Sequence, residues 1–113
     1  YRSIRFADVL LMAAEALNRG GINDVQAQIY LNRVRTRAML PDVVTGGVNL
    51  TNAIYHERRV ELVGEGHHFF DLVRTGRAAS EINGFQVGKH EVFPIPAIEI
   101  QLAGNRWEQN PGY

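Results

Sequence analysis

The chain has 113 residues and a mass of 12.7 kDa, and its 12 basic and 12 acidic residues give a formal net charge of zero. This balance argues against a nucleic-acid-binding protein, because such proteins usually carry a basic surplus. Hydrophobic residues make up 45% and charged residues 21%, as in one ordinary globular domain. The sequence has no cysteine, which excludes disulfides, thiolate zinc sites and a cysteine nucleophile.

The hydropathy and the start of the sequence give two expectations about the chain. No apolar run reaches the ~18 residues needed to cross a bilayer, and no signal peptide precedes the first helix. The sequence opens abruptly at Tyr1, without a starting methionine. We therefore expect residues 1–113 to be a single domain that belongs to a longer chain.

The first predicted helix runs from about Ile4 to Asn18, with Ser3 as its N-cap and Gly20-Gly21 as its end. Leu11 and Met12 lie beside the main apolar stripe, so the apolar arc is wider than a surface helix needs. This width predicts that the helix is buried on two sides. The stripe itself consists of Phe6, Val9, Leu10, Ala13, Ala14 and Leu17.

A second helix is predicted to begin at Asn23, which has capping-box spacing to Gln26. It also has two apolar faces, and Val25 and Ile29 form the second of them. The short glycine-rich link to the first helix predicts a helix hairpin. The main stripe consists of Ala27, Tyr30, Leu31, Val34 and Ala38.

A third helix is predicted over about 52–63, capped by Thr51. Its apolar and charged residues alternate around the helix, so no face is plainly a solvent face. We expect it to be packed on several sides, with its charges facing opposite charges, because an unpaired buried charge is strongly destabilising.

The rest of the chain is predicted to be a short helix over 67–74 and then mostly irregular. A polar stretch through residues 84–88, expected to be a loop or a short hairpin, leads to an extended segment at 92–96, where two prolines disfavour helix. One more short helix is expected over 97–102. The predicted fold class is therefore mainly α, an irregular helical domain with a TPR-like helix hairpin and an extended C-terminal tail with little strand.

Two segments partly match known cofactor-binding motifs, but each lacks a residue that its motif requires. His56–Val60 begins like a helical zinc motif, but Val60 stands where the second histidine is required. Gly64–Phe69 begins like a dinucleotide-binding loop, but it lacks the third glycine and follows a helix. No nucleophile elbow is present. The sequence thus predicts no cofactor, no metal and no catalytic residue.

The acidic residues near the centre of the chain have two interpretations. An unpaired couple among Glu57, Glu61 and Asp71 could serve a small hydrolase. Because arginines are interleaved with these acids, we favour a structural ion-pair network that joins the third helix to the fourth. Its predicted members are Glu57, Arg58, Arg59, Glu61, Glu65, Asp71 and Arg74.

The aromatic residues offer few sugar-stacking candidates. Trp107 and Tyr55 are the only ones that the sequence suggests, and Trp107 is expected instead to anchor the tail onto the body of the protein. Phe69 and Phe70 are expected to serve the core.

Several segments together resemble the SusD/RagB family. Glu57–Arg74 is similar to the family pattern E-R-R-x-E-L-x-x-E-G-x-R-x-x-D-L-x-R, although His68 stands where the family usually has arginine. Three further pieces agree in the same order. Arg5–Asn18 and Leu31–Ala38 resemble family helices, and Pro94–Ile100 with Gln109–Tyr113 resembles the family's ending.

The resemblance implies a mainly helical lipoprotein of the outer membrane that is exposed at the cell surface and is not an enzyme. Such a protein binds an oligosaccharide or polysaccharide and works with a SusC-like TonB-dependent transporter. This chain would be the C-terminal part, and the lipid anchor would lie in the upstream part of the same chain. No residue here matches a diagnostic glycan-contact motif, so the glycan-binding residues stay unknown.

A second hypothesis does not rest on the family. The two-sided apolar faces of the first two helices would also suit a stand-alone helical adaptor that binds peptides in a groove between helices.

Overall fold

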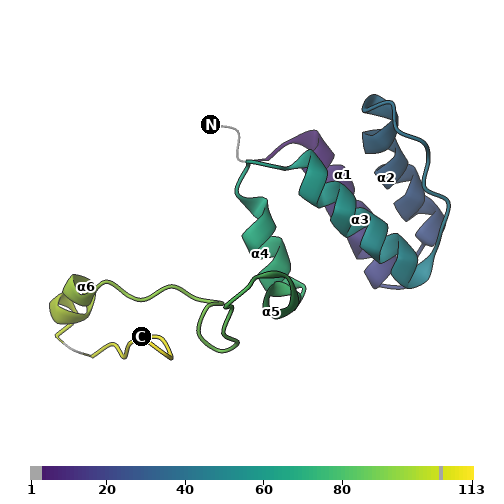
Figure 1. Ribbon diagram of the computed structural model, residues 1–113. Coiled ribbons are helices and arrows are strands. Elements are labelled where there is room, and N and C mark those ends of the chain that lie inside the picture. The colour runs from purple at the N-terminus through teal and green to yellow at the C-terminus, as the bar shows by residue number, and fades with distance from the viewer. Residues whose placement is uncertain (1–3, 105) are drawn as a thin grey trace. The chain divides into compact units, whose positions relative to one another are not determined.

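The computed structural model describes residues 4–104 and 106–113, and these residues form two compact units. The N-terminal unit ends at His68, and the C-terminal unit is Phe69–Tyr113. The described residues contain helices, turns and extended segments but no β-strand (Figure 1), which confirms the predicted mainly α fold. Within the same residues, no helix has both the length and the hydropathy of a membrane span.

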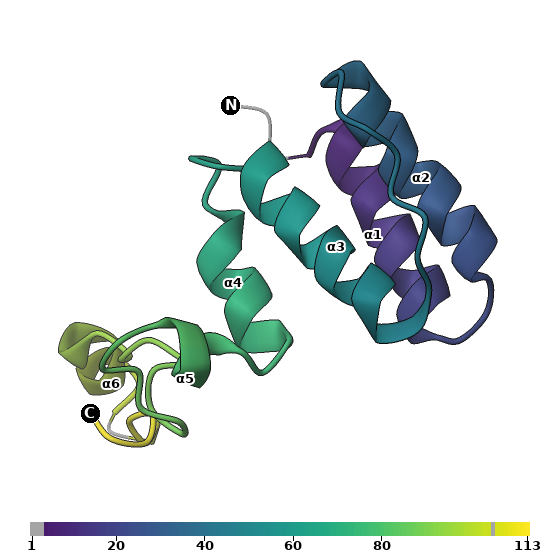
Figure 2. The ribbon, with the colours of Figure 1, turned by 45° about the vertical axis from the view of Figure 1, so that its right-hand side comes forward.

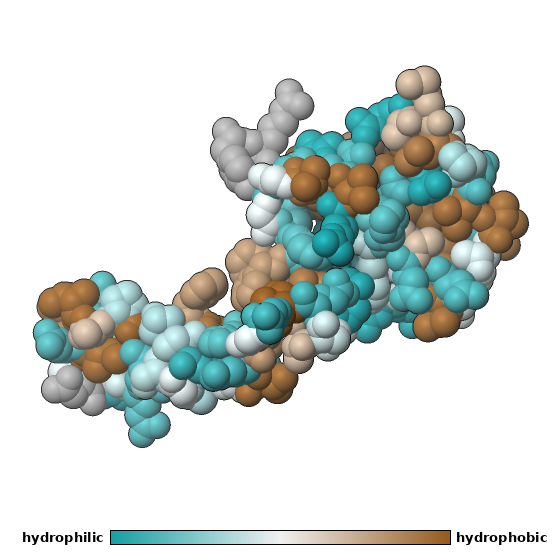
Figure 3. All heavy atoms as spheres, viewed as in Figure 1, coloured by the Kyte–Doolittle hydropathy of each residue, from teal (hydrophilic) through white to brown (hydrophobic). Residues whose placement is uncertain are grey.

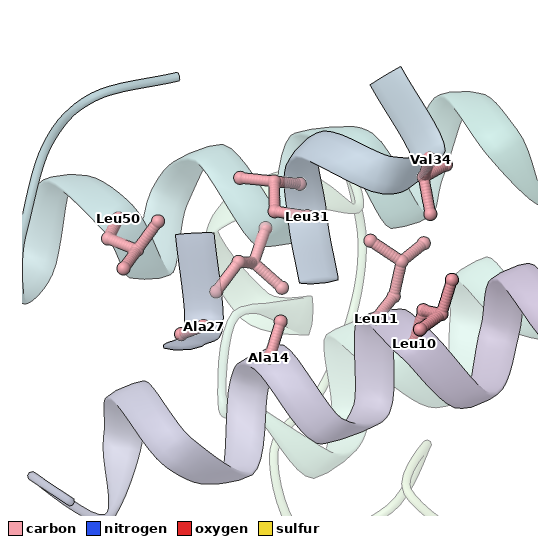
Figure 4. Close-up of a cluster of buried hydrophobic side chains, with 8 residues drawn as sticks. Leu10, Leu11, Ala14, Ala27, Leu31, Val34 and Leu50 are labelled. Atoms are coloured by element: carbon pink, nitrogen blue, oxygen red, sulfur yellow. The ribbon is translucent and has the colours of Figure 1, made fainter. Parts of the chain in front are cut away.

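Three helices make up the N-terminal unit: α1 (Phe6–Arg19), α2 (Asp24–Arg37) and α3 (Gly47–Glu61). They lie side by side in both views of the ribbon (Figure 2). α1 and α2 form the predicted helix hairpin, and α3 packs against both of them. Figure 4 shows side chains from all three helices meeting in one core. That core consists of Leu10, Leu11, Ala14, Ala27, Leu31, Val34, Leu50 and Ile54.

The buried face of α1 differs from the predicted stripe. Leu11 was expected beside the stripe and is fully buried, whereas Phe6 and Val9 are 64% and 43% exposed. The reason is that α1 contacts both α2 and α3, which centres its buried arc on Leu11 and Ala14. The predicted cap Ser3 lies outside the described residues, and the structure gives the N-cap position to Arg5, without a capping side chain.

The start of α3 is a second correction. The prediction of Thr51 as N-cap is wrong, because the helix already begins at Gly47. The Asp24 carboxylate, from the start of α2, accepts a hydrogen bond from the Gly47 backbone N–H at 2.6 Å. The Thr51 hydroxyl lies inside the helix and donates to the Asn18 side-chain oxygen at 2.6 Å. By contrast, the predicted cap of α2 is confirmed, since Asn23 accepts from the Gln26 N–H at 2.9 Å.

The C-terminal unit contains the short helices α4 (His67–Arg74, which begins at the end of the preceding unit), α5 (Ala78–Glu81) and α6 (Ala97–Leu102). α4 and α6 have the predicted bounds, whereas α5 was not expected. Phe69 contacts the rings of Phe70, Phe85 and Phe93, with centroid distances of 5.6, 6.5 and 6.3 Å.

Two expectations about aromatic burial in the C-terminal unit are wrong within this chain. Trp107 is 56% exposed and does not anchor the tail by burial, and Phe70 is 60% exposed. The fully or nearly buried residues described in this unit are few, namely Asp71, Leu72 and Ala78.

The tail is held by side chains instead of a buried aromatic. The Gln109 amide forms two hydrogen bonds with the backbone of Ile95, accepting from its N–H at 2.8 Å and donating to its carbonyl at 2.9 Å. Asn110 donates to the carbonyl of Phe93, and the Tyr113 hydroxyl donates to the carbonyl of Val92. The side chains of the last residues thus satisfy an extended segment that has no partner strand among the described residues.

Candidate functional site

The most concentrated chemistry of the N-terminal unit lies on the last turns of α3, where acids and arginines alternate. Arg58 projects toward α1 and donates to the Asp8 carboxylate at 2.8 Å. The two side chains are only 5% and 6% exposed. Such a pair is tolerated in the interior because each charge supplies the counter-charge and hydrogen bonds that water would otherwise give.

One residue earlier, Glu57 faces α2. Its carboxylate accepts from Arg35 at 2.6 Å, and the Glu57 side chain is 4% exposed. Because Glu57 and Arg58 are adjacent on a helix, they point about 100° apart. Through these two residues, α3 is ion-paired with both of its neighbouring helices.

A third group of contacts surrounds Arg5, just before α1. Its guanidinium donates to Glu61 at 2.9 Å and to Glu65 at 3.0 Å, and also to the Glu61 backbone carbonyl at 2.8 Å. Arg37 from α2 adds a contact of 2.6 Å to the Glu61 carboxylate. Glu61 thus connects the chain before α1, the end of α2 and the end of α3.

The electrostatic consequence is clearest at Arg5 and Glu65. The hydrogen bonds that Arg5 donates to Glu65 and Glu61 raise the pKa of its guanidinium above the ordinary value. The hydrogen bond from Arg5 in turn lowers the pKa of the Glu65 carboxyl below its ordinary value. Both shifts favour the charged forms that hold the contact together.

The remaining predicted members of the ion-pair network are Asp71, Arg74 and Arg59, and the structure places them outside the contacts described above. Asp71 accepts from Arg74 at 2.8 Å within α4, one turn apart. Arg59 lies on the exposed side of α3. The structure therefore brings Glu57, Arg58, Glu61 and Glu65 together with α1 and α2. Continuation of the network from α3 to α4 stays a prediction.

Sequence reasoning missed the partners of this cluster, which are Arg5, Asp8, Arg35 and Arg37. They are far from α3 in the chain, and helical spacing places only neighbours on one face. One signal was available: Asp8 occurs within the otherwise apolar sequence of the first helix, where a buried carboxylate needs a cation.

This arrangement is suited to holding helices together. The carboxylates of Glu57, Glu61 and Glu65 each accept from an arginine, so they are engaged inside the protein. In the part of the chain that the structure describes, no group of three or more histidine, aspartate or glutamate side chains could hold a metal ion.

Beside the cluster lies an open groove of about 590 Å³ on the N-terminal unit. It is lined by the start of α1 and the second half of α2, including Phe6, Leu10, Arg33 and Val34. The Arg33 guanidinium lies 5.5 Å from the centroid of the Phe6 ring. The groove thus combines an apolar wall with a positive charge.

The fold and the cluster together define a helical scaffold held by arginine–carboxylate pairs. Comparison with known proteins makes this specific, because the family model described as SusD family matches residues 1–91. The chain belongs to the SusD family.

Individual relatives agree with this assignment. SusD-like protein P2 of Formosa agariphila is 33% identical over all of this chain, which spans 26% of that relative. SusD-like protein P38 of the same organism is 39% identical over 71% of the chain and 18% of its own length. The crystal structure of a SusD homolog from Bacteroides thetaiotaomicron superposes on 96% of the chain with a TM-score of 0.87 and 38% identity, and the chain covers 25% of that structure. The chain therefore spans about a quarter of the length of these longer relatives.

Proposed function

We propose that this chain is the C-terminal part of a SusD-like lipoprotein that captures an oligosaccharide or polysaccharide at the surface of the outer membrane. The protein passes the glycan to a SusC-like TonB-dependent transporter and performs no catalysis. The observation that carries this proposal is the family match over residues 1–91, supported by structural similarity over 96% of the chain. The lipid anchor belongs to the upstream part of the protein.

Within that protein, the role proposed for these residues is structural. The network of Glu57, Arg58, Glu61 and Glu65 fixes α3 against the α1–α2 hairpin, and it has no carboxylate reserved for a substrate. Asp71 and Arg74 perform the same task inside α4, and Arg59 completes the set on the exposed side of α3. None of these residues is proposed to contact glycan.

The test uses the full-length protein. Isothermal titration calorimetry against a panel of oligosaccharides is expected to show binding without hydrolysis, and detergent extraction is expected to co-purify a TonB-dependent transporter. Chromatography of the sugars after incubation checks that they are intact. A full-length protein that binds none of the glycans and co-purifies with no transporter, or that cleaves a glycan, contradicts the proposal.

The network's structural role is tested separately with Arg58→Ala in the full-length protein. We expect a lower melting temperature and an unchanged glycan affinity at temperatures where the variant is folded. Arg106→Ala, on the exposed surface of the C-terminal unit, is the matched control. Unchanged melting with lost glycan capture would show that the cluster is a binding site.

One observation favours the alternative of a peptide-binding adaptor, namely the exposed apolar side chains of α1 and α2. The relatives argue against a stand-alone adaptor, because they are about four times as long as this chain. Light scattering on the isolated chain separates the two, since a monomer without self-association favours the adaptor, and association through the apolar face favours a part of a larger protein.

A further inference from the structure

The turn after α5 contains the one asparagine of the sequence that is followed directly by a glycine, Asn83-Gly84. The Phe85 N–H donates to the Ile82 carbonyl at 3.2 Å, which closes the turn. Gly84 has a φ of +79°, whereas Met39 is the one non-glycine residue with a positive φ among the residues described by the structure. A turn with a positive φ only at its third residue is of type II, and this position favours glycine.

This turn leaves the Asn83 amide and the Gly84 nitrogen accessible. Both residues are exposed, in a unit whose surface mixes hydrophilic and hydrophobic residues in the space-filling view (Figure 3). Within residues 4–104 and 106–113, the structure gives no hydrogen-bond partner to the Asn83 side chain or to the Gly84 N–H. A Cβ built on Gly84 would meet no heavy atom within 4 Å, so the space beside its backbone nitrogen is open.

An asparagine amide can be attacked by the backbone nitrogen of the next residue, and glycine, which has no Cβ, hinders this attack least. The Gly84 nitrogen loses its proton and forms a bond to the side-chain carbonyl carbon of Asn83. The bond from this carbon to the amide nitrogen breaks, and the amide group takes up a proton and leaves as ammonia. The product is a cyclic succinimide. Water then adds to either ring carbonyl and opens the ring to aspartate or isoaspartate, so no oxidant or reductant is needed.

We propose that Asn83 is a site of spontaneous deamidation, and that the isoaspartate product opens this turn. In isoaspartate the main chain runs through the former side chain and gains a carbon atom. The standard turn geometry that brings the Phe85 N–H to the Ile82 carbonyl is then lost. The Phe85 ring lies 6.5 Å from the Phe69 ring and 5.6 Å from the His90 ring, measured between centroids. The modification therefore also reaches the aromatic contacts of the C-terminal unit.

Peptide mapping of the full-length protein tests the site. The protein is incubated for weeks at physiological temperature and pH, and mass spectrometry of its peptides measures how much of each asparagine amide is lost. Asn52 is the matched control, since it is exposed and precedes the small Ala53, but it lies inside α3, where the helix binds the Ala53 N–H.

We expect the loss of the amide at Asn83 to exceed the loss at Asn52 many-fold. Part of the Asn83 product is expected to be isoaspartate, which enzymatic methylation detects. Asn83→Gln, whose longer side chain cyclises much more slowly, is expected to keep its amide. Loss at Asn83 that is equal to or below the loss at Asn52 overturns the proposal.

The effect on the turn is tested by amide hydrogen exchange of the incubated full-length protein. Freshly prepared Asn83→Asp is the matched control, because it carries the new negative charge on an unchanged main chain. We expect the Phe85 N–H to exchange faster in the isoaspartate form than in the fresh protein or in Asn83→Asp. Equal exchange in the three samples overturns the opening of the turn. Neither measurement involves glycan, so this proposal can fail while glycan capture is confirmed, or the reverse.

Discussion

At the scale of single residues, the Arg58–Asp8 pair shows how a charge becomes structural. The two groups are almost fully buried and 2.8 Å apart. A pair of this kind adds little net stability compared with apolar residues of the same shape, because both ions lose their hydration. Removing one partner is different, since the other charge is then buried without a counter-charge.

Arg58→Ala is therefore expected to lower the free energy of unfolding by about 3–5 kcal/mol. The control is Arg37→Ala, because Arg37 is 61% exposed and its partner Glu61 keeps Arg5. An exposed pair contributes about 1 kcal/mol or less. Chemical denaturation of the two variants measures the difference, and equal losses would contradict the special role of burial.

Asp24 provides a prediction for pH. Hydrogen bonds from the Asn18 side chain and then from the Gly47 N–H lower the pKa of the Asp24 carboxyl below its ordinary value of 3.8. Because the unfolded chain binds the proton more readily, this carboxylate stabilises the fold above about pH 3.8, and the stabilisation is lost as the pH falls through the lowered pKa.

The melting temperature of Asp24→Asn, which lacks this titrating group, is thus expected to lie below that of the wild type at neutral pH. The gap should narrow as the pH falls below 3.8. Differential scanning fluorimetry across that range measures both proteins. A gap that stays constant in acid means that the Asp24 charge does not stabilise the start of α3.

At the scale of helices and segments, the sequence was sufficient to predict where a helix begins or ends when the capping residue lies close to that end in the chain. Asn23 caps α2 through a residue three positions away, and α4 ends at Arg74, just before Gly76, whose φ is +71°. The start of α3 could not be found in this way. Its first N–H is bound by Asp24, 23 residues earlier, and this contact exists only after the start of α3 has packed against the start of α2.

The ion-pair cluster shows the same difference between local signals, which can be predicted from the sequence, and contacts between distant residues, which cannot. Alternating acids and arginines near the end of α3 indicate buried pairs, but spacing along the chain does not reveal which distant arginine each acid meets. The buried face of α1 was misplaced for a related reason. The Phe6 side chain is larger and more hydrophobic than that of Ala14. Even so, the contacts of α1 with α2 and α3 bury Ala14 and leave Phe6 exposed.

The tail offers an element-scale prediction at Gln109. Its side-chain amide forms hydrogen bonds with both the N–H and the carbonyl of Ile95, as a neighbouring strand would do in a sheet. Gln109→Ala is expected to leave these groups to water and to increase amide hydrogen exchange over residues 92–95. Gln101→Ala, on exposed α6, is the matched control. Exchange that is unchanged in Gln109→Ala would show that the tail is held by other contacts.

At the scale of the whole chain, the two units differ in how much core they contain. The N-terminal unit buries eight hydrophobic residues in one cluster from three helices. The C-terminal unit has 45 residues and buries few side chains, while Phe93, Leu102 and Trp107 are 68%, 75% and 56% exposed. A unit near the lower size limit for independent folding needs additional cover to be stable.

Hydrogen exchange on the 113-residue chain is therefore expected to show slow amides in α1, α2 and α3 and fast exchange throughout residues 69–113, because opening costs little free energy where few apolar contacts are lost. In the longer SusD-like protein proposed above, the same C-terminal residues should exchange slowly, since the rest of that protein would cover their apolar side chains. Equal protection of both units in the isolated chain would mean that the short helices and the Gln109 contacts are enough to hold the C-terminal unit. Fast exchange of that unit in the full-length protein would mean that its exposed aromatic residues are covered by nothing in the protein itself.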